Sequence, residues 1–272
     1  MEILMSVLSS ENIILVERTG DIVTVILNRP NKLNALNKAM WQRLAVVMNE
    51  LNDDHSIRCV ILRGAGDKAM GPGADISEFE SERCDSTKAA EYGAFMHRSM
   101  ASIRECQHPV VALIKGLCVG GALELALMCD LRICGKSSKF GIPINRLGLV
   151  MSHPEIEALV GLVGRSVALE ILFEARIFDS EEAKIKGLVN KVVPDNEVEL
   201  EVYETALRIS EGAPLVNRWH KKFVDRIIDG VKVAKPLNQS ELSEGFACFD
   251  THDFKMGYQA FLNKQKPKFE GR

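Results

Sequence analysis

The sequence predicts an α/β fold, because runs rich in β-branched residues alternate with segments whose apolar residues recur every three or four positions. The chain has 272 residues, of which 46% are hydrophobic, and this is enough for one sizeable core with a smaller appendage. The expected strands are 13–17, 22–27, 59–63, 110–114 and 130–134. The first two flank Arg18-Thr-Gly-Asp21 and should form a hairpin.

Helices are expected between and after these strands. Asn37 is a suitable N-cap for an amphipathic helix that runs to about residue 52, and a second helix should end before His108-Pro109. Its apolar face would contain Tyr92, Phe95, Met96, Met100 and Ile103. An apolar helix is expected from about 121 to 128, and after Pro194 the chain predicts helices only, including 197–211 and 254–265. We therefore expect an α/β core over residues 1–198 and a helical C-terminal part over 199–272.

Charge and cysteine usage limit the kinds of partner and the compartment. The net charge is −3 and no long run of like charge occurs, so neither nucleic acid nor a membrane surface is an expected partner. The seven cysteines form no C-x-x-C pair and stand mostly in apolar runs, as reduced core cysteines do. The N-terminus lacks a signal-like apolar stretch, and no apolar run reaches about 18 residues. These features predict a cytoplasmic protein.

Two glycine-rich turns each follow a buried strand. The first is Gly-Pro-Gly-Ala-Asp-Ile at 71–76, and the second, Val-Gly-Gly-Ala-Leu-Glu at 119–124, opens a helix. Backbone N–H groups in such turns can stabilise an oxyanion, and small residues let a substrate approach them. Taken singly, the first segment would serve equally well as a plain turn and the second as a site of close helix packing.

In order and spacing, many segments resemble the enoyl-CoA hydratase/isomerase (crotonase) family. The resemblance begins with Asn-Arg-Pro-Asn-Lys-Leu-Asn-Ala-Leu-Asn at 28–37 and covers nearly the whole chain. Further matching segments are 60–66, 73–76, 109–112, 120–121, 124–126, 129–132 and the ending 260–269. The resemblance implies a crotonase-like β/α spiral core that binds an acyl-CoA thioester. It also implies that the helical C-terminal part forms a homotrimer or a dimer of trimers.

The resemblance assigns roles to particular residues. It implies that the N–H groups of Ala74 and Gly121 are the oxyanion donors. The residues that would contact the substrate or its coenzyme A are Lys32, Ala35, Ala74, Ile76, Gly120, Gly121, Phe261 and Lys264, the last two often in a neighbouring subunit. Lys32 and Lys264 could equally be solvated surface charges. No metal is expected, since the histidines show no ligand spacing, and no cofactor beyond the coenzyme A moiety is implied.

Glu124 is the first candidate for proton transfer. It stands among apolar residues on every side of its helix, so its carboxyl group should be buried. Burial raises the pKa of a glutamate toward the range useful for a general acid or base. A buried glutamate that only bonds to the backbone is the alternative interpretation.

A second acid is missing where the family's hydratases have one. The resemblance implies a glutamate directly after a Phe-Gly-x-Pro motif, but Phe140-Gly-Ile-Pro143 is followed by Ile144, which cannot transfer a proton. His153, Glu155 and Glu157 are candidate substitutes. Ser152-x-x-Glu155 also fits a capping box with Pro154 in the first helical turn, and we favour this interpretation for Glu155.

These features favour an acyl-CoA lyase or isomerase of the enoyl-CoA hydratase/isomerase type, in which Glu124 acts as acid and base. Two alternatives remain open. One is an acyl-CoA hydrolase or decarboxylase that uses the same oxyanion site, and the other is a non-catalytic member that binds acyl-CoA.

Overall fold

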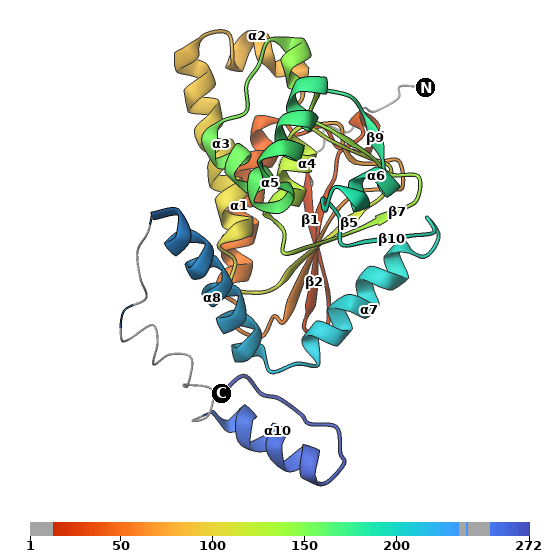
Figure 1. Ribbon diagram of the computed structural model, residues 1–272, viewed down its shortest axis with the longest axis vertical. Helices are drawn as coiled ribbons and strands as arrows, with labels where there is room; N and C mark the ends of the chain where they lie inside the picture. Colours follow the sequence, from red (N-terminus) through yellow and green to blue (C-terminus); the bar gives the residue numbers. More distant parts are fainter. Residues whose placement is uncertain (1–12, 234–237, 239–250) are drawn as a thin grey trace, which may run out of the picture.

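Two sheets form the core of the protein, for which a computed structural model describes residues 13–233, 238 and 251–272 (Figure 1). Within these residues the larger sheet has six strands in the order β1-β2-β3-β5-β7-β10. Their bounds are Ile14–Thr19, Ile22–Leu27, Cys59–Gly64, Val110–Ile114, Leu131–Gly135 and Lys191–Val193. The smaller sheet has the order β4-β6-β8-β9. Its strands are Ala69–Gly71, Leu117–Val119, Lys139–Gly141 and Phe178–Asp179.

The larger sheet confirms the predicted α/β fold. β1 and β2 form the expected antiparallel hairpin, whereas β2, β3, β5, β7 and β10 pair in parallel. Parallel neighbours need crossover connections, and helices supply them here. The sequence also predicted the positions of these strands to within about two residues, except for β10, which lies in the segment expected to be mainly helical.

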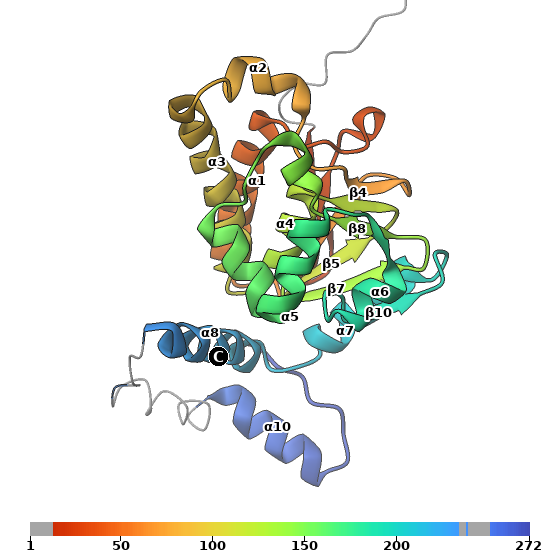
Figure 2. The ribbon, with the colours of Figure 1, turned by 45° about the horizontal axis from the view of Figure 1, so that its top comes forward.

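Alternate side chains of the larger sheet enter two different cores. One face packs against α1 (Lys38–Asp53), α3 (Ser86–Arg104) and α4 (Gly121–Met128), and Val60 and Leu62 belong to it. The opposite face, with Cys59 and Ile61, packs against α7 (Val198–Ser210). The period of two along β3 therefore separates the two faces, as a strand buried on both sides requires. Figure 2 shows α1 and α3 on one side of the molecule and α7 on the other.

The packing of α7 bears on the expected division of the chain at residue 198. Val198, Val202 and Ala206 are fully buried against the larger sheet, so the core packing continues past that boundary. The helices that follow are α8 (Pro214–Val233) and α10 (His252–Leu262), and both lie beyond the edge of the core (Figures 1 and 2). The expected helices at 197–211 and 254–265 are thus present, while their predicted role in oligomerisation stays a prediction.

The remaining described elements are short helices and one long helix. The short helices are η2 (Pro30–Lys32), η3 (Ile76–Glu78), α2 (Phe79–Glu82), η4 (Pro143–Leu147) and α6 (Ser180–Ile185). Asn37 caps α1 as predicted, because its side chain accepts a hydrogen bond from the Met40 N–H at 3.0 Å. The long helix α5 (His153–Glu174) is kinked at Gly164, where φ is 72°. No helix among the described residues combines the length and apolar composition needed to cross a membrane.

Candidate active site

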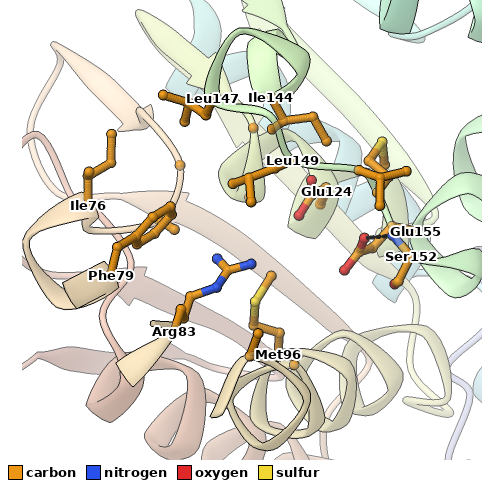
Figure 3. A pocket seen from close by; sticks show the side chains of 18 of the residues that line it. Ile76, Phe79, Arg83, Met96, Glu124, Ile144, Leu147, Leu149, Ser152 and Glu155 are labelled. Carbon is orange, nitrogen blue, oxygen red and sulfur yellow. Dashed lines mark hydrogen bonds between the residues drawn. The ribbon is translucent and has the colours of Figure 1, made fainter. Parts of the chain in front are cut away.

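A cavity of about 460 Å³ lies between the two glycine-rich turns and the helices α2, α3 and α5. Its walls are mainly apolar. In Figure 3, Ile144 and Leu147 of η4 lie on one side of the cavity, and Met96 of α3 lies on the other. Further apolar side chains in the lining are those of Ile76, Phe79, Leu149, Val150 and Met151. Apolar walls with a few convergent polar groups are typical of a site for a small organic substrate.

The N–H group of Ala74 is directed toward the second turn by a single β-bridge. Leu36 donates its N–H to Gly73 O at 2.9 Å and accepts the Asp75 N–H at 2.8 Å. Successive peptide groups in an extended segment face opposite sides, so the Ala74 N–H points away from Leu36. The bridge therefore places this donor on the side of Gly121.

Gly73 and Gly121 bring the two turns into close contact. Gly73 has φ +110°, and a Cβ atom built on it would lie 3.4 Å from the Gly121 nitrogen. A Cβ atom on Gly121 would in turn lie 3.6 Å from the Ala74 nitrogen. Within the described residues, neither the Ala74 nor the Gly121 N–H donates to another backbone group. Two unused donors thus share one small space, and one of them belongs to the first turn of α4.

The 28–37 segment holds the first turn in place. The Asn34 side chain is buried, donates to Ala69 O at 2.8 Å and accepts the Arg29 N–H at 3.1 Å. Arg29 also forms an ion pair with Asp75, with 2.9 Å between Nη1 and Oδ2. Through these contacts, polar residues of the 28–37 segment hold the backbone around Ala74 in position.

Glu124 is buried as predicted, with 4% of its surface exposed. Its side chain reaches the cavity from the first turn of α4 (Figure 3). Burial raises the pKa of the Glu124 carboxyl well above its ordinary value, the nearby Glu155 raises it further, and the Arg83 guanidinium lowers it. The neutral form of Glu124 is therefore favoured around neutral pH.

Glu155 has two roles at once. It completes the predicted capping box at the start of α5, where its Oε2 accepts the Ser152 N–H at 2.6 Å. It is also buried and lines the cavity, so a second carboxyl group faces Glu124. The His97 Nε2 atom lies 3.2 Å from Glu155 Oε1 and 2.8 Å from Ser152 Oγ. Capping thus fixes this carboxyl group at the cavity wall.

The structure separates the other candidate acids from the cavity. His153 is the exposed first residue of α5 and is not among the residues that line it. Glu157 is exposed on the same helix and forms an ion pair with Arg104, with 3.8 Å between Oε1 and Nη1. Of the three proposed substitutes for the missing acid, only Glu155 is brought together with Glu124. Ile144 lines the cavity and leaves its own position without an acid.

The residues expected to contact coenzyme A are divided between the cavity and the surface. Ile76 lines the cavity together with Ala74, Gly120 and Gly121, and it is 59% exposed. Ala35 is buried in the neighbouring loop, whereas Lys32 and Lys264 are exposed. Phe261 belongs to α10, and its side chain lies outside the part that the structure describes. Within the described part of the chain, Lys32, Ala35 and Lys264 do not line the cavity.

Several cavity residues were not predicted from the sequence. Phe79 lines the cavity from the start of α2 and Arg83 from its end. Met96 and His97 line it from α3. Met96 was expected only as a core residue, and no motif marks the other three. The sequence positions of these four residues form no recognisable motif, because the residues meet only when α2 and α3 pack beside the glycine-rich turns. Among the described residues, no group of three or more His, Cys, Asp or Glu side chains is placed to hold a metal ion.

Comparisons with known proteins agree over the whole of this architecture. The family model described as enoyl-CoA hydratase/isomerase matches residues 17–272. The chain is 35% identical to a crotonyl-CoA hydratase of Syntrophomonas wolfei over 95% of this chain and 98% of the relative. It is 32% identical to a short-chain-enoyl-CoA hydratase of Clostridium acetobutylicum over 94% of this chain and 96% of the relative.

Solved structures extend the same comparison to three dimensions. A crystal structure of an enoyl-CoA hydratase/carnithine racemase from Magnetospirillum magneticum is 47% identical, with a TM-score of 0.93 over 96% of each chain. An enoyl-CoA hydratase from Bacillus anthracis is 29% identical with a TM-score of 0.86, over 96% of this chain and all of the other. With these sequence and fold matches, the chain belongs to the enoyl-CoA hydratase/isomerase (crotonase) family.

Proposed function

We propose that the protein catalyses the reversible hydration of 2-enoyl-CoA thioesters. The observation that carries this proposal is the meeting of two buried carboxyl groups, Glu124 and Glu155, in one cavity beside the unused N–H groups of Ala74 and Gly121. Hydration needs a base for water, an acid for the α-carbon and donors for an enolate oxygen. The cavity offers a group for each of these needs.

The thioester carbonyl oxygen would accept hydrogen bonds from the N–H groups of Ala74 and Gly121. When the oxygen of a water molecule adds to C3, the electrons of the C2–C3 double bond move toward C1 and place negative charge on this oxygen. The two backbone donors stabilise that charge, and losing one donor of this kind costs a factor of about 100 or more in rate. Protonation at C2 then restores the carbonyl group.

We assign the proton of the carboxyl pair to Glu124, because burial and the nearby Glu155 both favour its neutral form. Glu124 would donate this proton to C2. Glu155, which already accepts the Ser152 N–H, would accept a proton from the attacking water. Transfer of a proton from Glu155 to Glu124 then restores the starting state. In this assignment Glu155 replaces the acid that Ile144 lacks.

Double-bond isomerisation is a second candidate, favoured by Ile144 in the cavity wall. An isomerase moves one proton between two carbon atoms of the acyl chain and needs no activated water. Glu124 alone could perform that transfer, with Ala74 and Gly121 still holding the enolate. A 3-enoyl-CoA converted to its 2-enoyl isomer without hydration would favour this reaction.

The test is the loss of the enoyl-thioester absorbance when the protein meets crotonyl-CoA. We expect Glu124→Gln and Glu155→Gln each to lower kcat by about 100-fold or more, with little change in acyl-CoA binding. Glu157→Gln is the matched control, because Glu157 is exposed on the same helix as Glu155 and does not line the cavity. Turnover that survives Glu124→Gln would contradict the assigned role. Tight binding without turnover of any enoyl-CoA would favour a non-catalytic acyl-CoA binder.

We further propose that the coenzyme A moiety of the substrate is the only cofactor and that it follows Lys32, Ala35 and Ile76. Ile76 supports this path, because it is exposed and also lines the cavity. A homotrimer or dimer of trimers would let Phe261 and Lys264 of a neighbouring chain reach the same coenzyme A. The cytoplasmic location expected from the cysteines stays a prediction.

A further inference from the structure

Arg83 is a charged residue in an otherwise apolar part of the cavity wall. It is half-buried at the end of α2, and Figure 3 shows its guanidinium group directed into the cavity beside Met96. The guanidinium carbon lies 4.7 Å from the centre of the Phe79 ring and 5.2 Å from that of the Tyr92 ring. Two aromatic rings thus hold the group in place by cation–π contact.

Three acidic residues close to Arg83 in the sequence are engaged elsewhere. Glu78 accepts hydrogen bonds from the Tyr92 hydroxyl group at 3.0 Å and from the Lys38 N–H at 2.8 Å. Glu82 pairs with the Lys38 side chain at 2.7 Å, and Asp85 caps α3. In the part of the chain that the structure describes, no carboxylate forms an ion pair with Arg83 and no acceptor hydrogen-bonds to its guanidinium group.

A guanidinium group carries five N–H donors in a planar arrangement that matches the two oxygens of a carboxylate. Partial removal of these donors from water disfavours the group unless an acceptor is supplied. Here the ring contacts with Phe79 and Tyr92 supply none. A ligand in the cavity can supply that acceptor, and the mainly apolar walls would strengthen the resulting pair.

We propose that the acyl group bound in this cavity carries a carboxylate beyond its reacting carbon atoms and that Arg83 binds this carboxylate. The inference rests on the proposed function for the direction of the acyl chain, which leaves the Ala74 and Gly121 donors and enters the space beside Glu124. Arg83 lies near enough to lower the pKa of Glu124, which supports a position close to the reacting part of the chain. The substrate class is therefore that of short dicarboxylic acyl-CoA thioesters.

Binding of two saturated thioesters of equal length tests this proposal without any chemical step. Glutaryl-CoA ends in a carboxylate, and valeryl-CoA ends in a methyl group at the same position. By titration calorimetry we expect the intact chain to bind glutaryl-CoA at least about tenfold more tightly, because charge-assisted hydrogen bonds contribute on that scale. Arg83→Met should reduce the ratio of the two affinities to about one, and Arg83→Lys should keep part of it.

Arg98→Met is the matched control. Arg98 also lies over an aromatic ring, with 4.8 Å between its guanidinium carbon and the centre of the Phe95 ring, but it is exposed on α3 and does not line the cavity. Its removal should leave the ratio unchanged. Equal affinities in the wild-type protein would overturn the proposal, and so would a preference for glutaryl-CoA that survives Arg83→Met.

Turnover separates this inference from the proposed function. Glutaconyl-CoA and 2-pentenoyl-CoA are the matching unsaturated thioesters, and the wild-type protein should hydrate the former with the higher kcat/KM. If neither is hydrated while glutaryl-CoA still binds preferentially through Arg83, the proposed reaction fails and the carboxylate site stands. If both are hydrated equally well and the saturated pair shows no preference, the reaction stands and the carboxylate site fails.

Discussion

Glu124 and Glu155 reach the same cavity through different local structures. Glu124 projects from an apolar helix that gives its carboxyl group little solvation, whereas Glu155 is fixed by the capping box of α5. Burial and the nearby Glu155 both raise the pKa of Glu124, so Glu124 keeps its proton around neutral pH. A single proton is also what the addition of water requires from the pair.

The raised pKa of Glu124 predicts how the stability of the fold depends on pH. The folded protein binds this proton more tightly than the unfolded chain does, so the free energy of unfolding should fall as pH rises from the ordinary glutamate range toward the raised pKa. Glu124→Gln cannot lose a proton and should remove this contribution. We therefore expect the variant to gain stability relative to wild type with rising pH, by at most about 1.4 kcal/mol per pH unit. Urea unfolding at acidic, neutral and alkaline pH measures the difference, and a constant difference would contradict the prediction.

Gly73 is the position where one methyl group should damage the oxyanion site most directly. Its φ of +110° disfavours other residues, and a Cβ atom would lie 3.3 Å from Val119 O and 3.4 Å from the Gly121 nitrogen. We expect Gly73→Ala to lower kcat for crotonyl-CoA by about 100-fold, because the two donors would be pushed out of position. Gly20→Ala is the control, since Gly20 also has positive φ, +64°, but has open space around it in the β1–β2 turn. A similar loss of kcat in both variants would count against the geometric explanation.

The helix α4 connects the oxyanion site to the core, and the backbone groups at its two ends have different partners. Its N-terminus offers the Gly121 N–H to the cavity, while its C-terminal carbonyl groups are bound by the buried Arg132. Arg132 donates to Cys129 O at 2.5 Å and to Ala126 O at 3.3 Å, and its Nε atom donates to Leu188 O at 2.9 Å. A cation at the C-terminus of a helix also suits the helix dipole.

Removal of the Arg132 guanidinium group should therefore destabilise the fold. We expect Arg132→Met to lower the free energy of unfolding by about 2 to 4 kcal/mol, because several buried carbonyl groups would lose their donors. Urea unfolding gives this value. Arg208→Met provides the comparison, since Arg208 forms ion pairs at an exposed site and should contribute less than about 1 kcal/mol. Equal effects of the two substitutions would show that burial of Arg132 is not what matters.

Elements with a sustained pattern were predictable from the sequence, and short elements were not. The strands of the larger sheet up to β7 and helices such as α1 and α3 have regular apolar spacing, so their positions follow from periodicity. Strands β4, β6, β8 and β9 have only two or three residues each, and such runs carry no period. The smaller sheet was therefore missed, although the glycine-rich turns next to it were identified.

The same distinction applies to the site. The two glycine-rich turns were identified because the approach of two backbones requires small residues, and the resemblance to the crotonase family pointed to Ala74 and Gly121 within them. Arg83 and His97 come from α2 and α3, and their approach to Glu124 depends on how those helices pack. His153 was an attractive acid by chemistry alone, but its side chain at the start of α5 is exposed and does not line the cavity. The direction of each side chain on α5 therefore determines that Glu155 lines the cavity and His153 does not.

At the scale of the whole molecule, α8 presents an exposed apolar surface. Val224, Ile227 and Ile228 are 55%, 56% and 42% exposed. On the same helix, Arg218 donates to His55 O at 3.0 Å, and Lys221 forms an ion pair with Asp130 at 2.9 Å. The helix is thus fastened to the core through polar contacts while apolar side chains remain on its surface. An apolar cluster of this kind is typical of a subunit interface and supports the proposed trimer.

The proposed assembly makes the last prediction. The wild-type protein should scatter light as a particle of three or six chains of 30.2 kDa, and Ile227→Glu combined with Ile228→Glu should shift it toward a monomer. Ile185→Glu is the control, because Ile185 is 86% exposed on α6, away from α8. If Phe261 and Lys264 of one chain reach the coenzyme A of its neighbour, the monomeric variant should also have a higher KM for crotonyl-CoA. A wild-type monomer would contradict the assembly, whereas a trimer whose dissociation leaves KM unchanged would retain the interface but remove the C-terminal residues from the coenzyme A site.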